Sequence, residues 1–223
     1  MFRELVFKGF GHPEAEGRVL LSRHYKHGVN GAIKNQLAPG EAELAQKRGE
    51  ALASMLSGDG VQVAGAFSSP QPRCIASLIH TMIGMGELLP IHTIQELSDI
   101  TAEPVVDMEL LKLKQERLGI ASGEEAMLRL DIAETMQRNV FKRSKDGSRA
   151  LLGCSRYYPG KTVLVFSHSG SRIEPSILGL KNRVAKNRVD LGMPNRMFKT
   201  GEMVELIVNL TTGRLVEENY LDF

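Results

Sequence analysis

The sequence predicts an α/β protein in which strands and helices alternate along the chain to form a doubly wound sheet. Three observations indicate this fold class. Short apolar runs recur between longer segments of helical spacing, and no repeat array or low-complexity linker interrupts the 223 residues. The hydrophobic content of 42% is sufficient for one core. We therefore expect a single domain that spans residues 1–223.

The first half of the chain contains three expected strands. Arg18–Ser22 encloses the apolar run Val-Leu-Leu, which is typical of a fully buried strand. The segment Leu37–Gly58 has helical spacing, with Pro39 suited to its first turn and its final glycine suited to the helix end. Similar patterns predict three further elements: a strand at Val61–Phe67, a helix at Arg73–Met85 and a strand at Ile91–Ile94.

The middle of the chain, about residues 101–158, has a different character. It is charged, carries no clear strand, and is expected to be helical around Glu109–Leu118 and Glu124–Lys142. We interpret it as a helical insertion or lid. After it we expect a strand within Lys161–Gly170, a helix near Glu174–Leu180, and two closing strands, "EMVELIVNL" and "GRLVEENY".

Composition limits the function classes. The chain has 28 basic and 26 acidic residues, and this balance gives no indication of binding to nucleic acid or to a membrane. Two cysteines, Cys74 and Cys154, provide neither a disulfide framework nor a metal-binding pair. No apolar stretch approaches the length of a membrane span, and the first residues lack the apolar region of a signal peptide. We expect a cytoplasmic protein, and the oligomeric state stays open.

Two of the expected strands end alike. "VLLSRH" and "VLVFSH" each bring a histidine, His24 and His168, to a carboxyl end, and Arg23 precedes the first of them. A third strand ends in "SSPQPR", which brings Arg73 to the same edge. In open α/β sheets, ligands bind beyond the carboxyl ends of the strands. We therefore expect these four side chains to converge on one pocket.

The four residue types suit one kind of chemistry. Two guanidinium groups match the oxygens of a phosphate, a neutral imidazole can attack phosphorus, and a second, protonated imidazole can stabilise the transferring group. A lone histidine at a strand end is more often structural, so the hypothesis depends on the four together. His24 and His27 could suggest zinc, but no further cluster supplies the remaining ligands. The pattern favours phosphoryl transfer through a phosphohistidine, with no metal ion or other cofactor.

At this point the sequence resembles the histidine phosphatase superfamily, the phosphoglycerate mutase-like proteins. The matching segments follow the family's order from about Arg18 to Leu210: "RHYKHGVN", "LAPGEAELAQKRGEAL", "FSSPQPRCIAS", "ELSDI" and "VLVFSHSG". The resemblance implies a three-layer, doubly wound, mostly parallel sheet with a helical insertion. It also implies roles for six residues: His24 as nucleophile, Arg23, Asn30, Arg73 and His168 as phosphate-binding residues, with His168 also catalytic, and Asp99 as proton donor.

Several positions depart from the family pattern. Tyr25 replaces a glycine and is expected at the edge of the pocket, and Lys26 replaces an acidic or amide residue. His27 replaces a threonine and is expected at the rim. Asp99 is one methylene shorter than the usual glutamate, and Ser169 replaces a glycine. The proton could also come from Glu96, Glu103 or water, and Arg172 either reaches the phosphate or faces solvent.

These features predict a metal-independent phosphomonoesterase that acts through a phosphohistidine on His24. Its substrate would be a phosphorylated small molecule or a phosphopeptide. Two alternatives stay open. Phosphoglycerate mutase-type transfer would use the same chemistry but return the phosphoryl group to the bound product. A catalytically weak phospho-ligand binding or regulatory module is the alternative that the departures at Tyr25, His27 and Asp99 suggest.

Overall fold

The computed structural model describes residues 16–28, 36–99, 116–117, 119, 140–186, 188–194 and 196–223 of the chain. Their strands form one six-stranded sheet in the order β3-β2-β4-β1-β5-β6. The first four strands in this order are parallel, and β5 and β6 join the β1 edge antiparallel. The strands are β1 (Glu16–Arg23), β2 (Val63–Ser68), β3 (Ile91–Thr93), β4 (Thr162–Ser167), β5 (Met203–Asn209) and β6 (Leu215–Leu221). The predicted α/β class with a mostly parallel sheet is confirmed.

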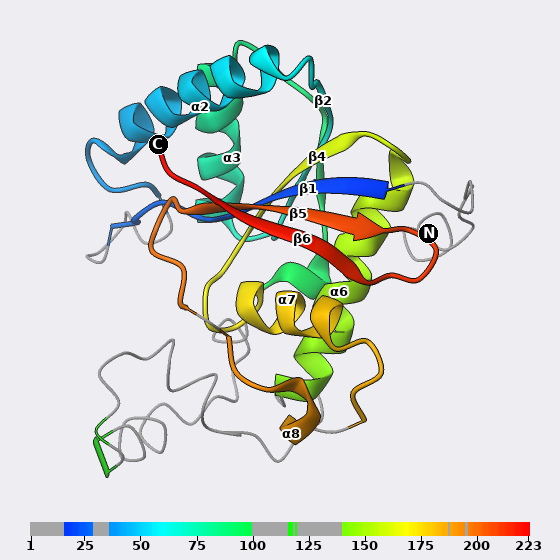
Figure 1. Ribbon diagram of the computed structural model, residues 1–223. Coiled ribbons are helices and arrows are strands. Elements are labelled where there is room, and N and C mark those ends of the chain that lie inside the picture. Colours follow the sequence, from blue (N-terminus) through cyan, green and yellow to red (C-terminus); the bar gives the residue numbers. More distant parts are fainter. Residues whose placement is uncertain are drawn as a thin grey trace.

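Helices cover both faces of the sheet, so the fold has three layers (Figure 1). One face is covered by α2 (Glu41–Gly58) and α3 (Pro72–Met85), which pack against each other. The other face is covered by α6 (Val140–Tyr157) and α7 (Ile173–Lys181). Two short helices complete the described elements, the 3₁₀ helix η2 (Gln95–Leu97) and α8 (Arg188–Leu191).

The central strands β1 and β4 are buried on both faces. Leu20 and Leu164 pack with α2 and α3, whereas their neighbours Val19, Leu21 and Val163 pack with α6 and α7. This alternation follows from the two-residue period of a strand. A strand that is covered on both sides needs apolar residues at successive positions, which is why the sequence shows continuous apolar runs here.

Helix α2 begins later than the sequence predicts. Pro39 lies before the helix rather than inside its first turn, and Gly40 precedes the first helical residue with φ 79°. This left-handed conformation is accessible to glycine at little cost. The chain therefore makes its turn at residues 39–40 and enters the helix at Glu41.

Helix α6 lies inside the range predicted as an insertion or lid, but it is part of the core. Leu151, Leu152 and Cys154 belong to the larger buried cluster. Apart from Val140 and Arg143, the rest of its buried face is built from small residues, and Gly147 lies directly against Ser176 of α7. A helix face made of small polar residues, with charged residues beside it, gives no clear hydrophobic periodicity, so the sequence did not predict this helix as part of the core. The expected helix at 109–118 and most of that at 124–142 lie outside the described residues.

The parallel strands all end at the same edge of the sheet, and this edge brings together the segments that follow β1, β2, β3 and β4. None of the helices that the structure describes combines the length and the apolar character needed to cross a membrane.

Candidate active site at the carboxyl edge of the sheet

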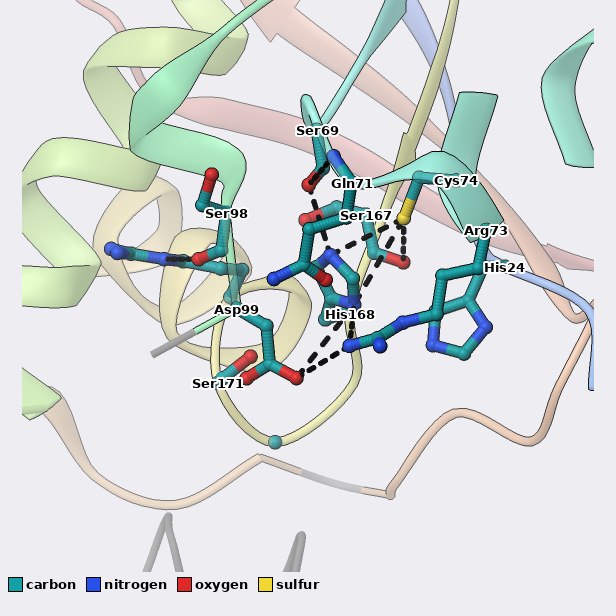
Figure 2. A network of polar contacts seen from close by, with 12 residues as sticks. His24, Ser69, Gln71, Arg73, Cys74, Ser98, Asp99, Ser167, His168 and Ser171 are labelled. Atoms are coloured by element: carbon teal, nitrogen blue, oxygen red, sulfur yellow. Dashed lines mark hydrogen bonds and ion pairs between the residues drawn. The ribbon is translucent and has the colours of Figure 1, made fainter. Parts of the chain in front are cut away.

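Four segments deliver polar side chains to this edge. His24 follows the last residue of β1, and His168 follows the last residue of β4. Arg73 lies in the first turn of α3, directly after the turn that ends β2, and Asp99 follows η2. Figure 2 shows that these four side chains lie close together. The ring centroids of His24 and His168 are 5.1 Å apart, so the structure brings together the two histidines that the strand-end pattern paired.

The position of the proton on His24 follows from its hydrogen bond. Its Nδ1 lies 2.7 Å from the backbone carbonyl oxygen of Tyr25. A carbonyl oxygen can only accept, so Nδ1 carries the proton and Nε2 keeps its lone pair. Burial lowers the pKa of His24 to about 4, against the opposing effect of the Tyr25 hydrogen bond. The ring is therefore neutral near pH 7, with one nitrogen available as a nucleophile.

His168 is almost completely buried and is contacted on both ring nitrogens. Nη2 of Arg73 donates to its Nδ1 at 3.3 Å, and the Ser69 hydroxyl lies 3.0 Å from its Nε2. Cys74 Sγ is 3.3 Å from the same Nε2. Burial holds the pKa of His168 well below its usual value, although Asp99 acts in the opposite direction. The ring is thus neutral in this arrangement, whereas the phosphoryl-transfer hypothesis used a protonated second imidazole. A phosphate dianion bound beside the ring would favour its protonation.

Arg73 connects Asp99 with His168. Its Nη2 donates to Asp99 Oδ2 at 2.8 Å, and the same carboxylate oxygen lies 4.0 Å from Nδ1 of His168. Both partners of this ion pair are mostly buried. The predicted proton donor therefore lies inside the cluster, next to a predicted phosphate ligand. Its role as donor stays a prediction.

Arg23 is the last residue of β1, and its side chain contacts the segment that leads into β5. Its Nη1 donates to the carbonyl oxygen of Phe198 at 2.6 Å. This contact fixes one end of the guanidinium group through a residue 175 positions away in the sequence. Asn30, the further predicted phosphate ligand, lies outside the described residues, and so does Glu103.

Tyr25 does not lie at the pocket edge, so that prediction is wrong. Its side chain is buried between the sheet and the α2–α3 layer, and the guanidinium carbon of Arg48 lies 5.6 Å from its ring centroid. A side chain at Gly201 would collide with this ring. Burial raises the pKa of Tyr25. The side chain is not at the pocket edge because it packs in the core, and the contact of Tyr25 with His24 is made by its backbone carbonyl oxygen.

His27 lies close to the predicted nucleophile. Its side chain is half-buried, and its ring centroid is 5.7 Å from that of His24. Within the described parts of the chain, no group of three or more His, Cys, Asp or Glu side chains could hold a metal ion.

A buried carboxylate organises the loop after His168, and no motif in the sequence pointed directly to its role. Oε1 of Glu174 accepts the Ser169 hydroxyl at 2.5 Å and the Phe198 N–H at 3.0 Å, and its Oε2 accepts the Gly170 N–H at 2.6 Å. Burial raises the pKa of Glu174, and these hydrogen bonds oppose the shift. The serine that departs from the family pattern is thus a donor to this carboxylate. Sequence reasoning could have found the pair from the unusual Ser169 and an acid five residues later.

Two arginines also hold this loop. Arg143 of α6 is fully buried and donates from Nη1 to the carbonyl oxygens of Gly170 and Ser171, at 3.2 and 3.0 Å. Nε of Arg172 donates to the Ser98 carbonyl oxygen at 2.5 Å. Arg172 is buried, so the alternative in which it faces solvent is wrong. The loop that carries His168 is therefore fixed from α6, from α7 and from the segment before Asp99.

Comparison with known proteins defines the fold. No protein-family model matches the sequence, and no curated protein matches it. Among solved structures, a phosphoglycerate mutase from Bacillus anthracis has a TM-score of 0.58 at 15% identity, with 93% of each chain covered. A phosphoserine phosphatase from Entamoeba histolytica, in complex with 3-phosphoglyceric acid, has a TM-score of 0.56 at 19% identity, with 92% of this chain and 98% of that chain covered. A mycobacterial glucosyl-3-phosphoglycerate phosphatase has a TM-score of 0.59 at 11% identity, covering 92% and 97%.

The architecture and these matches together define a three-layer α/β protein with the phosphoglycerate mutase-like fold. This is the fold that the resemblance of the sequence to the histidine phosphatase superfamily implied. At identities of 11–19% the matches establish the fold, and the activity has to be argued from the site.

Proposed function

We propose that the protein is a metal-independent phosphomonoesterase that transfers a phosphoryl group to Nε2 of His24 and then to water. The observation that carries this proposal is the hydrogen bond from His24 Nδ1 to the Tyr25 carbonyl oxygen, at 2.7 Å. It directs the lone pair of Nε2 away from the backbone, and burial keeps the ring neutral at physiological pH. The matched phosphatases support the same class of reaction.

The reaction takes two displacements. In the first, Nε2 of His24 forms a bond to phosphorus and the bond to the leaving oxygen breaks, with Arg23, Arg73 and His168 holding the equatorial oxygens. The leaving oxygen takes a proton from Asp99, which has to be protonated when the substrate is bound. A phosphate dianion that replaces the Asp99 carboxylate as the partner of Arg73 would favour that protonation. In the second, water attacks the phosphohistidine and returns a proton to Asp99, and inorganic phosphate leaves with His24 again neutral. Asn30 would add a phosphate contact if the resemblance extends to it.

Two alternatives remain as proposals. In a mutase-type reaction the phosphohistidine would return its group to the bound organic product instead of to water, and a phosphoglycerate mutase is among the structures with this fold. A catalytically weak phospho-ligand binding or regulatory module is favoured by one observation: in its ion pair with Arg73, the Asp99 carboxylate has no proton to give to a leaving group. The substrate class in every case is a phosphorylated small molecule or a phosphopeptide.

The test is hydrolysis of para-nitrophenyl phosphate in the presence of EDTA. We expect turnover by the wild type and a loss of at least about 10⁴-fold in His24→Ala, because the nucleophile is removed. His80→Ala is the matched control, since His80 lies on α3 and is hydrogen-bonded to Gln46, away from the cluster. Rapid quenching with substrate should trap acid-labile, base-stable phosphate on the wild type and none on His24→Ala.

Each alternative has its own outcome. Conversion of 3-phosphoglycerate to 2-phosphoglycerate without phosphate release would favour the mutase. Binding of para-nitrophenyl phosphate without turnover would favour the binding module. Full activity in a folded His24→Ala variant would overturn the assignment of the nucleophile.

A further inference from the structure

Four basic side chains gather along α6, away from the candidate active site. Three are on the helix itself and the fourth follows α7: Lys145, Arg149, Arg156 and Arg183. Two of them lie against the β5–β6 turn, which is at the opposite edge of the sheet from His24 and His168, because β5 runs antiparallel to β1 (Figure 1). We propose that this distal cationic cluster binds a polyphosphate group, either inorganic or as part of a nucleotide.

Arg183 lies at the centre of the cluster and is held in place by its neighbours. Its backbone carbonyl oxygen accepts from Nζ of Lys145 at 3.0 Å, and its Nη1 donates to the Ser148 hydroxyl at 3.4 Å. A side chain at Gly213 would begin only 3.1 Å from Nε of this arginine and 3.2 Å from its Nη2. The guanidinium group therefore lies between α6 and the β5–β6 turn, and its position is set before any ligand binds.

The positive charges of the cluster are positioned mainly by neutral groups. Nε and Nη2 of Arg156 donate to the carbonyl oxygen of Leu210, at 3.1 and 2.5 Å. Among the described residues, the one carboxylate that forms an ion pair with the cluster is Asp146, which lies 4.0 Å from Nη1 of Arg149. The same carboxylate also pairs with Lys142 at 3.5 Å. The described surroundings thus leave an excess of positive charge at the cluster.

The four cations are close enough to repel one another. Burial lowers the pKa of Arg183, and the charges of Arg156 and Arg149 lower it further. Burial also lowers the pKa of Lys145, and the charges of Arg183 and Arg149 act in the same direction. An anion bound among these side chains would replace repulsion between like charges with attraction.

The shape of the cluster favours a chain of phosphates over a single anion. The backbones of Lys145 and Arg156 are separated by about 16 Å along α6, at a rise of 1.5 Å per residue. Arg183 lies between these two ends, because it contacts Lys145 and Ser148 and is affected by the charge of Arg156. A single phosphate can contact only cations gathered around one point, whereas a diphosphate or triphosphate extends along the helix. Guanidinium groups also match phosphate oxygens in a bidentate geometry.

Calorimetric titration with inorganic tripolyphosphate and with ATP tests the proposal, at about 50 mM salt, where charges are weakly screened. His24→Ala is the background, so that the proposed nucleophile cannot consume the ligand. Adding Arg149→Gln should weaken tripolyphosphate binding about fivefold and Arg183→Gln about tenfold, and both together should reduce the number of ligands bound per chain by one. Lys47→Gln is the matched control, since Lys47 is exposed on α2, on the other face of the sheet.

The two probes identify the source of the phosphates. Equal affinities for tripolyphosphate and ATP would show that the phosphate chain alone is recognised, and tighter binding of ATP would identify a nucleotide as the ligand. In the protein with His24 intact, Arg149→Gln should leave the hydrolysis of para-nitrophenyl phosphate unchanged, because Arg149 lies away from the candidate active site.

Three results would overturn the proposal. Unchanged affinity and stoichiometry in the Arg149→Gln and Arg183→Gln variants would show that the cluster is not the site. An equal loss in Lys47→Gln would mean that only the overall charge of the protein matters. Orthophosphate binding to the cluster as tightly as tripolyphosphate would exclude recognition of a phosphate chain. Arg149 is 60% exposed, so its substitution decides the question even if Arg183→Gln does not fold. The readout is a difference between variants with the same active site, and it holds whether or not the protein is a phosphatase.

Discussion

His24 and Tyr25 are adjacent in the sequence and perform different tasks through different parts of the residue. The imidazole of His24 is aimed at the cluster with His168, whereas the tyrosine ring is buried under the helices on one face of the sheet. The tyrosine carbonyl fixes the histidine tautomer at 2.7 Å. The contact with His24 does not depend on the tyrosine side chain, because the backbone carbonyl supplies it.

Asp99 is the predicted proton donor, and its substitution tests that role. If it protonates the leaving oxygen, Asp99→Asn should slow hydrolysis of alkyl phosphates by about 10²- to 10⁴-fold, the usual contribution of general acid catalysis. It should slow para-nitrophenyl phosphate much less, because that leaving group is already a stable anion. The asparagine keeps an oxygen that can accept from Arg73, so the ion-pair geometry is disturbed little. Steady-state kcat on both substrates measures the difference.

Glu96→Gln is the comparison variant, since Glu96 lies in η2, three residues before Asp99. A selective loss on alkyl phosphates in Glu96→Gln, but not in Asp99→Asn, would move the proton donor to Glu96. Equal losses on both substrate types in Asp99→Asn would exclude it as the donor.

Among the elements, α7 connects two parts of the candidate site. It begins at Ile173, five residues after His168, and Glu174 in its first turn holds the preceding loop and the Phe198 N–H. The carbonyl of Phe198 in turn accepts from Arg23. The Glu174 carboxylate thus connects the loop that carries His168 with Arg23, through Phe198. α6 reinforces the same loop through Arg143.

The second prediction concerns this link. Glu174→Gln replaces a carboxylate that accepts three hydrogen bonds with an amide whose NH₂ group cannot accept. We expect a stability loss of about 1–3 kcal/mol from the groups left unsatisfied, with a roughly tenfold fall in kcat/KM because a misplaced phosphate ligand weakens transition-state binding. Urea unfolding and kinetics with para-nitrophenyl phosphate measure the two effects.

Leu178→Ala separates positioning from stability alone. Leu178 is buried on the same helix and should lose at least as much stability, about 2–5 kcal/mol, while keeping kcat/KM within about twofold. If both variants lose activity in proportion to their stability, the link through Glu174 has no specific role in positioning.

Two of the six histidines of the protein, His24 and His168, lie in a buried cluster, and this affects the stability of the molecule towards acid. The pKa of His24 falls from 6.5 to about 4 on folding, and that of His168 is lowered as well. Between pH 6.5 and 4 the unfolded chain binds protons that the folded protein does not bind. The folded state therefore loses stability as the pH falls through this window, and below about pH 4 the contribution of His24 no longer changes.

The size of the effect gives the third prediction. The depression of the His24 pKa corresponds to roughly 3 kcal/mol at 1.36 kcal/mol per pKa unit. Urea unfolding of wild type and His24→Gln at pH 7, 6, 5 and 4 should show a difference in unfolding free energy that shrinks or reverses as the pH falls. Contributions from the carboxylates cancel in this difference. A constant difference across the range would mean that His24 keeps an ordinary pKa in the folded protein.

Local features of the sequence were sufficient for much of the fold and for the centre of the site. Continuous apolar runs identified β1, β2 and β4, because strands covered on both faces need apolar residues at every position. The carboxyl ends of parallel strands meet at one edge, so the strand pattern by itself was enough to group His24, Arg73 and His168. Helix limits such as the start of α2 were less accurate, since they depend on turn geometry.

Other features depend on contacts between distant segments, and the tertiary structure alone decided them. The sequence shows neither that Tyr25 turns into the core nor that Arg143 reaches the loop after His168, because both depend on how α2, α3 and α6 pack on the sheet. Glu174 becomes a bridge only when the segment before β5 lies beside α7. The distal cationic cluster has the same origin, since Arg183 joins the cations of α6 only when the segment after α7 lies against that helix.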